Sequence, residues 1–217
     1  MDVDVFCGGM VQTNGYLVTQ DGAALVVDAP EGITDWVESR CTKQRLKPAA
    51  LLVTHGHWDH TLEAAAIQKR LQVPVLIHRD SQRLLEEPAM QAAYSPFYEL
   101  EACRADRVLN QETELKLGPF ACKLLLCPGH CPGSLCFYFS KEGMLFGGDV
   151  LFQGAVGRWD LPGGSEGALM NSIRTRILPL PDETRIFPGH GPTTTVGDER
   201  RANPFLLGLQ QSRSHGL

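Results

Sequence analysis

The sequence predicts an α/β fold in which two sheets have helices outside them. The first half of the chain alternates strand-like and helical segments, and the part from residue 114 onward is rich in short β-like runs divided by Gly and Pro turns. This order fits two sheets better than a single doubly wound sheet. The chain has 217 residues, 43% of them apolar, which is enough for one sizeable core. We therefore expect one domain spanning residues 1–217.

The first half begins with two β-rich runs separated by Asp21-Gly22, a dipeptide typical of hairpin turns. Apolar residues then recur at roughly helical spacing from Ile33 to Leu46, and Pro48 is expected to end that helix. The segment 79–103 has a loose helical pattern broken by Pro88 and Pro96, and the sequence assigns it no role. The expected elements are strands at 11–19, 23–28, 49–53 and 75–77 and helices at 33–46 and 62–71.

The second half combines short strands with two helices. The runs 120–127 and 134–139 are the longest of the expected strands, and Pro204 is expected to interrupt the last helix. The expected elements are strands at 114–117, 120–127, 134–139, 144–146 and 185–187 and helices at 166–177 and from Asp198 onward.

Composition and charge exclude several classes of partner. The formal net charge is −5, and Lys and Arg are scattered along the chain, so we expect no nucleic-acid partner. The start MDVDVFCGGM lacks the basic and apolar regions of a signal peptide, and no apolar run has the length of a membrane span, so no membrane association is expected. Seven cysteines without CxxC spacing favour reduced thiols and a cytoplasmic location.

The stretch LLVTHGHWDHT at residues 51–61 is the most informative in the chain. It places His55, His57, Asp59 and His60 directly after an apolar run. Crowded imidazoles repel one another when protonated and cost desolvation when buried neutral, so such a cluster indicates a cation among them. Residues two apart in extended backbone project to the same side, so His55 and His57 can bind one ion. Asp59 and His60 lie where the chain turns into a helix and face elsewhere, which predicts a second, neighbouring ion.

Three further strand ends carry metal-binding side chains. Residues 124–130 (LLLCPGH) and 185–190 (RIFPGH) each run an apolar strand into Pro-Gly-His, and residues 144–149 (MLFGGD) end in aspartate. Glycines let the backbone turn sharply, so that loops from several strands can converge on one site. Together with the first cluster this gives five imidazoles and two carboxylates. Such a donor set suits zinc, iron or manganese rather than calcium.

These motifs resemble the metallo-β-lactamase-fold hydrolases, from about Asn14 to Asn203. Within that superfamily the chain is most similar to the short single-domain branch of the glyoxalase II group, the hydroxyacylglutathione hydrolases. The similar stretches are THGHWDH at 54–60, PGH at 128–130, GGDVLF at 147–152, GRWDLPGG at 157–164, GHGP at 189–192 and NPFL at 203–206. The resemblance implies an αββα sandwich of two mixed sheets flanked by helices, with the metals at one edge between the sheets.

The resemblance also implies a ligand set for two divalent ions, zinc first, with iron or manganese as alternatives. One ion would be bound by His55, His57 and His130, the other by Asp59, His60 and His190, and Asp149 would bridge both. The expected reaction is attack of metal-bound hydroxide on the carbonyl of a small thioester, hydroxyacylglutathione first among them. Asp59 and Asp149 are the expected catalytic residues, and either can orient the attacking water or accept its proton.

Arg158 is the expected substrate-binding residue, because the family carries a basic residue near the glutathione moiety at this place. The alternative is a salt bridge to Asp160 or another neighbour. Two-domain members of the family use a C-terminal helical domain for much of their thiol-carrier binding, whereas only residues 191–217 follow His190 here. The partner is therefore expected to be a small-molecule thioester, with glutathione as a possible carrier. The sequence predicts no oligomeric state.

Other activities on the same scaffold are weighed against this expectation. A mononuclear iron persulfide dioxygenase shares the fold, but those proteins usually carry Cys-Gly-Arg-Thr-Asp-Phe where this chain has VGRWDL at 156–161. RNA-processing nucleases need a basic surface. Asp149 stands where the true β-lactamases have a cysteine ligand, which argues against antibiotic hydrolysis. A binding module without catalysis is the non-enzymatic alternative, and the complete ligand set argues against it.

Overall fold

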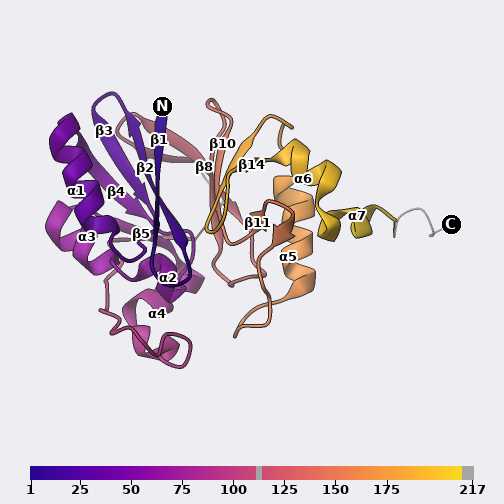
Figure 1. The fold of residues 1–217 in the computed structure, drawn as a ribbon, viewed down its shortest axis with the longest axis horizontal. Helices are drawn as coiled ribbons and strands as arrows, with labels where there is room; N and C mark the ends of the chain where they lie inside the picture. The colour runs from indigo at the N-terminus through magenta and orange to yellow at the C-terminus, as the bar shows by residue number, and fades with distance from the viewer. Residues whose placement is uncertain (111–113, 212–217) are drawn as a thin grey trace.

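The protein is a sandwich of two six-stranded mixed sheets with helices on the outer faces, as Figure 1 shows. The structure is a computed structural model that describes residues 1–110 and 114–211. The first sheet contains, in spatial order, β1 (Asp2–Gly8), β2 (Thr13–Gln20), β3 (Ala23–Val27), β4 (Lys47–Leu52), β5 (Val75–His78) and β6 (Arg107–Leu109). The second contains β14 (Thr194–Thr195), β13 (Arg185–Pro188), β10 (Met144–Gly148), β9 (Leu135–Phe139), β8 (Phe120–Leu126) and β7 (Glu114–Leu117). The predicted fold class is confirmed.

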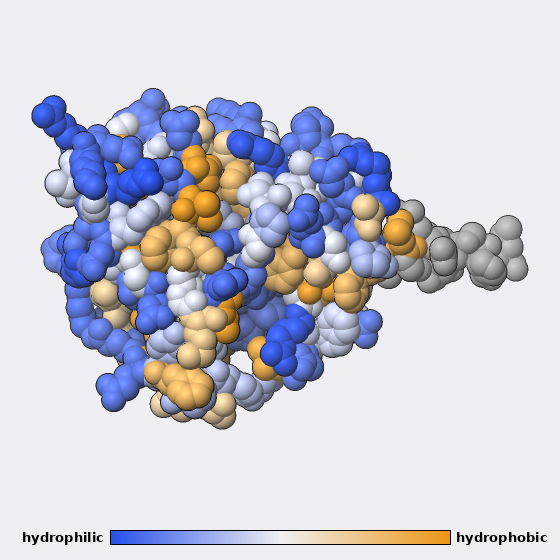
Figure 2. All heavy atoms as spheres, in the orientation of Figure 1, coloured by the Kyte–Doolittle hydropathy of each residue, from blue (hydrophilic) through white to orange (hydrophobic). Residues whose placement is uncertain are grey.

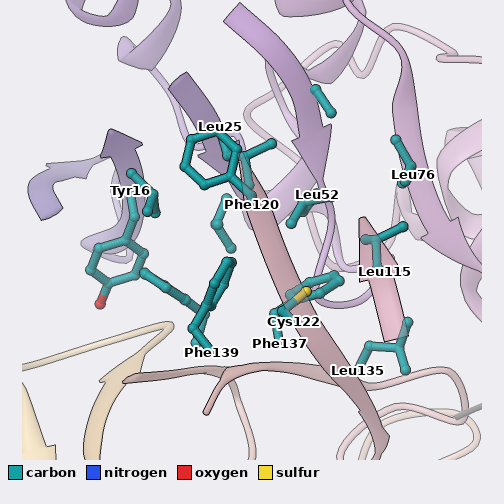
Figure 3. Close-up of a cluster of buried hydrophobic side chains, with 14 of the residues drawn as sticks. Tyr16, Leu25, Leu52, Leu76, Leu115, Phe120, Cys122, Leu135, Phe137 and Phe139 are labelled. Carbon is teal, nitrogen blue, oxygen red and sulfur yellow. The ribbon is translucent and has the colours of Figure 1, made fainter. Parts of the chain in front are cut away.

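The central strands of each sheet are covered on both faces, which explains why β3 and β9 are almost continuously apolar, whereas the edge strands β1 and β7 are partly exposed. Between the sheets, side chains such as Tyr16, Leu52, Phe137 and Phe139 form one buried cluster (Figure 3). The outer face of the first sheet packs against α1 (Ile33–Gln44) and α3 (Ala64–Leu71). The outer face of the second packs against α5 (Glu166–Ser172), which continues into a π-helical turn, Ile173–Ile177.

The predicted elements of the first half are largely present. Asp21 and Gly22 both have positive φ, 49° and 77°, as a tight hairpin turn between β2 and β3 requires. The prediction that Pro48 ends the helix was wrong. The helix α1 ends at Gln44, where Arg45 takes the left-handed conformation, and Pro48 lies inside β4. The register between β3 and β4 shifts beside Pro48, which accommodates a residue that has no N–H to donate.

Several boundaries differ from the expected ones. The expected helix at 62–71 corresponds to α3, which begins at Ala64, and a separate short helix, α2 (Trp58–Thr61), precedes it. Within 79–103 only α4 (Arg79–Glu86) and the 3-10 turn η1 (Pro88–Gln91) are helical. The last expected helix is divided into α6 (Val196–Ala202) and α7 (Pro204–Gln211), with the break where Pro204 predicts it. Five strands were not predicted from the sequence: β1, β6, β11 (Leu151–Phe152), β12 (Ala155–Val156) and β14.

No helix in the described part of the chain is long and apolar enough to cross a membrane. The expectation of a single domain over residues 1–217 stays a prediction.

Candidate metal centre

Loops from both sheets converge at one edge of the sandwich. The His55–His60 segment follows β4 of the first sheet, and His130, Asp149 and His190 follow β8, β10 and β13 of the second. The helix α2 starts at Trp58, so the extended backbone that carries His55 and His57 changes direction before Asp59. All seven predicted ligands are brought together by this arrangement.

Two groups of three donor residues lie side by side. In His55, His57 and His130 the donor atoms are within 4.8 Å of one another, and His57 Nδ1 lies 2.8 Å from His130 Nε2. The second group, Asp59, His60 and His190, is equally compact. The division of the His55–His60 segment between two sites therefore agrees with the side-chain directions expected from its sequence.

Asp149 lies between the two groups and contacts both. Its Oδ1 is 3.3 Å from His60 Nε2, and its Oδ2 is 3.5 Å from both His130 Nε2 and His190 Nε2. The side chain also forms a third compact group with His55 and His60. One carboxylate can thus be shared between two ions.

Two buried polar atoms that make no hydrogen bond fit a bound cation at the centre. His60 Nε2 and Asp149 Oδ1 face each other at 3.3 Å, but neither has a hydrogen-bond partner among the described residues. A buried polar atom without a partner costs about 1–3 kcal/mol, so these two atoms are expected to bind something. A divalent ion accepts lone pairs from both, and a mixed nitrogen and oxygen donor set is one that zinc, iron and manganese bind.

Charge in the two groups is distributed unequally. Burial first, and the neighbouring His130 second, lower the pKa of His57 to about 4, so its imidazole is neutral, as a metal ligand must be. Burial also opposes the charged form of His60, but Asp59, Asp149 and Asp28 outweigh it and raise the pKa of His60 above its usual value. The second group is therefore surrounded by carboxylates that favour positive charge.

Asp28 supports the second group and was missed by the sequence analysis. Its Oδ2 accepts hydrogen bonds from His60 Nδ1 and Thr54 Oγ1, both at 2.8 Å, and its Oδ1 accepts one from Thr54 N at 2.7 Å. The same signal that identified Asp149, an aspartate at the end of an apolar strand, was present at Asp28.

Other hydrogen bonds hold the ligand loops in place. His130 Nδ1 donates to Arg158 O at 2.8 Å, and Thr13 Oγ1 donates to Asp59 Oδ2 at 2.7 Å. Asn14 Nδ2 and Tyr16 OH both donate to Pro188 O, at 3.1 and 2.6 Å, which fixes the strand end that leads to His190. Each of these contacts joins parts of the chain that are distant in sequence, so they are visible only in the folded protein.

A pocket of about 290 Å³ opens over the metal-binding groups, with Arg158 in its lining. The side chain of Arg158 is 61% exposed, and its Nε and one terminal nitrogen each donate to Asp160 at 2.7 Å. The two alternatives weighed for Arg158 are therefore compatible, since the residue both lines the pocket and pairs with Asp160. The complete lining is Val11, His57, Trp58, Asp59, Leu84, Met90, Gln91, Tyr94, His130, Asp149, Arg158, Leu161, Pro162 and His190.

Residues 8–190 match the Metallo-beta-lactamase superfamily. The chain belongs to this family. It is therefore a metal-dependent hydrolase by family, and the superfamily implies divalent metal binding at a site of this kind. The expected resemblance to metallo-β-lactamase-fold proteins is confirmed.

Individual members of the superfamily are similar over nearly the whole chain. Hydroxyacylglutathione hydrolase GloC of Haemophilus influenzae is 36% identical over 208 residues, which cover 95% of this chain and 98% of that protein. The crystal structure of BLEG-1 B3 metallo-beta-lactamase has a TM-score of 0.89 and 38% identity, covering 94% of this chain and 99% of that one. The crystal structure of TTHA1623 in a di-iron-bound form has a TM-score of 0.83 and 36% identity, covering 94% and 100%.

Proposed function

We propose that this member of the metallo-beta-lactamase superfamily hydrolyses small thioesters, with hydroxyacylglutathione as the first substrate to test. The observation that carries the proposal is the pair of three-residue groups joined by Asp149 at the base of the pocket. When bound, two divalent ions lower the pKa of a water molecule toward neutrality and polarise a carbonyl oxygen. The choice of substrate is supported by the relative named hydroxyacylglutathione hydrolase GloC.

The proposed ligands follow the two groups. His55, His57 and His130 would bind one ion, Asp59, His60 and His190 the other, and Asp149 would contact both. Zinc is the proposed ion and iron or manganese are the alternatives, because the same nitrogen and oxygen donors accept all three. Iron is a proposed alternative because the relative TTHA1623 has been crystallised in a di-iron-bound form.

Asp59 and Asp149 are the proposed catalytic residues. Both line the pocket, so their carboxylates can orient a water molecule toward a carbonyl carbon or take its proton. Thr13 Oγ1 and the imidazole of His190 contact Asp59 Oδ2 at 2.7 and 3.2 Å, and these contacts fix the direction of that carboxylate. Fixing a group before the reaction lowers the entropic cost of the attack.

Arg158 is the proposed contact for the thiol carrier. Its exposed guanidinium lines the pocket, where a carboxylate of glutathione can take over its hydrogen bonds from Asp160. We also propose a cytoplasmic location, because all seven cysteines are free thiols and thiols persist in reducing compartments.

The decisive experiment compares three activities of protein purified without chelator. We expect two tightly bound metal ions per chain by elemental analysis, thiol release from S-lactoylglutathione under anaerobic conditions, and no oxygen consumption with glutathione persulfide. Hydrolysis of a β-lactam is the third activity to measure, because the BLEG-1 relative is named as a metallo-beta-lactamase. If the metal-loaded protein releases thiol from no thioester, the proposal is wrong, and oxygen uptake with persulfide would replace it with the dioxygenase alternative.

Asp149→Ala provides the matched inactive variant. Changing a residue that only supports a metal ligand costs about 10–100-fold in metal affinity or activity, so losing the shared carboxylate is expected to cost at least about 100-fold in turnover. Asp35→Ala on the exposed face of α1 is the control and should retain both ions. Two tightly held ions and undiminished turnover in Asp149→Ala would exclude a bridging role.

A further inference from the structure

One wall of the pocket over the ligands is mostly apolar, and the proposed function does not use it. This apolar wall comprises four of the residues that line the pocket. Tyr94 and Met90 form its outer part, each with 47% of its surface exposed, and Trp58 and Leu84 lie deeper. In Figure 2 hydrophobic surface gathers on the lower part of the face, where Figure 1 shows the segment that follows α4. The apolar wall consists of Trp58, Leu84, Met90 and Tyr94.

Gln91 holds this wall against the metal-binding loop. Its side chain is buried, Oε1 accepts a hydrogen bond from Trp58 N at 2.8 Å, and Nε2 donates to Gly56 O at 2.9 Å and Leu84 O at 3.1 Å. The ring of Trp58 packs on Tyr98 with 5.1 Å between the ring centroids. The wall is therefore formed before any substrate binds, and binding against it costs little ordering of the chain.

Polar recognition of a substrate hydroxyl is scarce along this wall. The amide of Gln91 is engaged at both ends by the backbone. The phenol of Tyr94 is the one hydroxyl among the described residues that line the pocket, and Arg158 is their one arginine or lysine, already paired with Asp160. A methylene placed here gains contact with apolar surface, whereas a hydroxyl group loses water and has only the phenol of Tyr94 and the indole N–H of Trp58 as polar groups within the wall.

We propose that the apolar wall is an acyl-binding subsite, and that the protein prefers thioesters of short unsubstituted acyl groups, such as butanoyl, over hydroxyacyl thioesters. The inference rests on the proposed thioester hydrolysis and specifies its substrate class. The acyl group lies along Trp58, Leu84 and Met90, while the thiol carrier extends toward Arg158 at the exposed side of the pocket.

The test is a two-way series of thioesters with the metal-loaded protein. Acetyl, propanoyl, butanoyl, lactoyl and 2-hydroxybutanoyl groups are each attached to glutathione and to N-acetylcysteamine, a small neutral thiol. We expect kcat/KM to rise about fourfold for each methylene from acetyl to butanoyl on both carriers. Butanoyl is expected to exceed 2-hydroxybutanoyl. The proposed subsite would be wrong if kcat/KM did not change with acyl length, if the hydroxyacyl groups reacted faster, or if the preference depended only on the carrier. Absence of thiol release from every thioester would instead show that thioester hydrolysis itself is wrong.

A binding measurement separates the subsite from catalysis. S-methyl-, S-propyl- and S-butylglutathione are thioethers that cannot be hydrolysed, and calorimetry should give a Kd that falls with alkyl length. Equal affinities for the three thioethers would contradict the inference even if turnover is fast.

Matched variants locate the effect. Met90→Gln is expected to remove about fourfold or more of the advantage of butanoyl over acetyl, and Met10→Gln, at a methionine that is 62% exposed and lines no part of the pocket, should leave the ratio unchanged. Tyr94→Phe should preserve or increase the preference for butanoyl. A selective loss of hydroxyacyl turnover in Tyr94→Phe would show that its phenol recognises the hydroxyl, and the inference would then be wrong.

Discussion

Asp28 Oδ2 lies 2.8 Å from His60 Nδ1, and this buried contact joins the end of β3 to α2, the helix that carries Asp59 and His60. Asp28 reaches it from a left-handed backbone conformation, with φ of 60°, which is uncommon for a residue other than glycine. The same carboxylate accepts two hydrogen bonds from Thr54, the residue before His55. Asp28 therefore fixes the direction of His60 and the position of the loop that carries His55 and His57.

Replacing Asp28 with asparagine is expected to weaken the second group in particular. An amide offers one acceptor oxygen where the carboxylate offers two, so Asp28→Asn cannot serve both Thr54 N and His60 Nδ1. Loss of such a supporting contact typically costs about 10–100-fold in metal affinity. Elemental analysis after dialysis against a weak chelator should show the metal content falling from two ions per chain toward one.

The control is Asp21→Asn, since Asp21 is exposed and also has a positive φ, 49°. Asparagine tolerates this conformation, so both substitutions place an asparagine in the same left-handed backbone conformation. Asp21→Asn should keep its full metal content. Equal metal loss in both variants would mean that the backbone, and not the contact with His60, is responsible.

Gly189 tests how closely the ligands are packed. A Cβ at this position would lie 2.1 Å from Asp149 Oδ1 and 2.6 Å from His60 Cε1, so Gly189→Ala must displace one of these ligands. We expect metal affinity to fall by about 10–100-fold, as it does when a ligand loses its orientation. Gly167→Ala in α5 meets no atom within 4 Å and should retain its metal, with stability unchanged or about 0.5–1 kcal/mol higher. Retention of two tightly bound ions by Gly189→Ala would show that the ligands are less constrained.

The sequence predicted the elements that carry strong local signals. The hairpin at Asp21-Gly22 and the strands that end near His130 and His190 are defined by turn residues and apolar runs within a few positions of one another. The seven predicted ligands lie in segments that follow apolar strands, and these strand ends meet at one edge of the sandwich. Their being brought together could therefore be expected from the sequence, whereas their binding of metal stays a prediction.

Features that depend on the assembled fold were missed. The strand β1 pairs with β2 at the edge of a sheet, and β6 is three residues long, so neither has much signal of its own. Pro48 was assigned to a helix end because the rule for proline is local, whereas its place in β4 depends on a register shift opposite β3. Gln91 contacts residues seven to 35 positions away, and no pattern in its own segment indicates that role.

Gln91→Leu is expected to destabilise the protein and loosen the pocket. The substitution leaves Trp58 N, Gly56 O and Leu84 O without their partner, at a cost of about 1–3 kcal/mol. For a chain of this length, where each kcal/mol shifts Tm by about 2–4 °C, that corresponds to a Tm lower by about 2–12 °C in thermal denaturation. The control is Gln82→Leu, because among the described residues the Gln82 side chain is hydrogen-bonded to Glu86 alone, one turn along α4. This variant should change stability by no more than about 0.5 kcal/mol. An unchanged Tm in Gln91→Leu would refute the proposed attachment of the wall to the metal-binding loop.

Arg158 permits a test of carrier recognition that leaves the metal centre intact, because His130 contacts its backbone oxygen and not its side chain. In Arg158→Gln we expect KM for a glutathione thioester to rise about 2- to 5-fold, the range for an exposed ion pair, with no change for the N-acetylcysteamine thioester. In Asp160→Asn we expect KM for the glutathione thioester to fall, since the guanidinium of Arg158 is then free to bind a substrate carboxylate.

The Arg158–Asp160 pair itself should not vary with pH near neutrality. Hydrogen bonding from Arg158 lowers the pKa of Asp160 to about 2, so its carboxylate stays charged throughout the neutral range and the effect of Asp160→Asn should be the same at pH 6 and pH 8. The control for Arg158→Gln is Arg79→Gln, which should leave KM unchanged for both carriers. The Arg79 side chain is similarly exposed, at 65%, and lies 3.5 Å from Asp80. If Arg158→Gln raises KM equally for both carriers, its side chain does not recognise the carboxylate, and the carrier must be bound elsewhere.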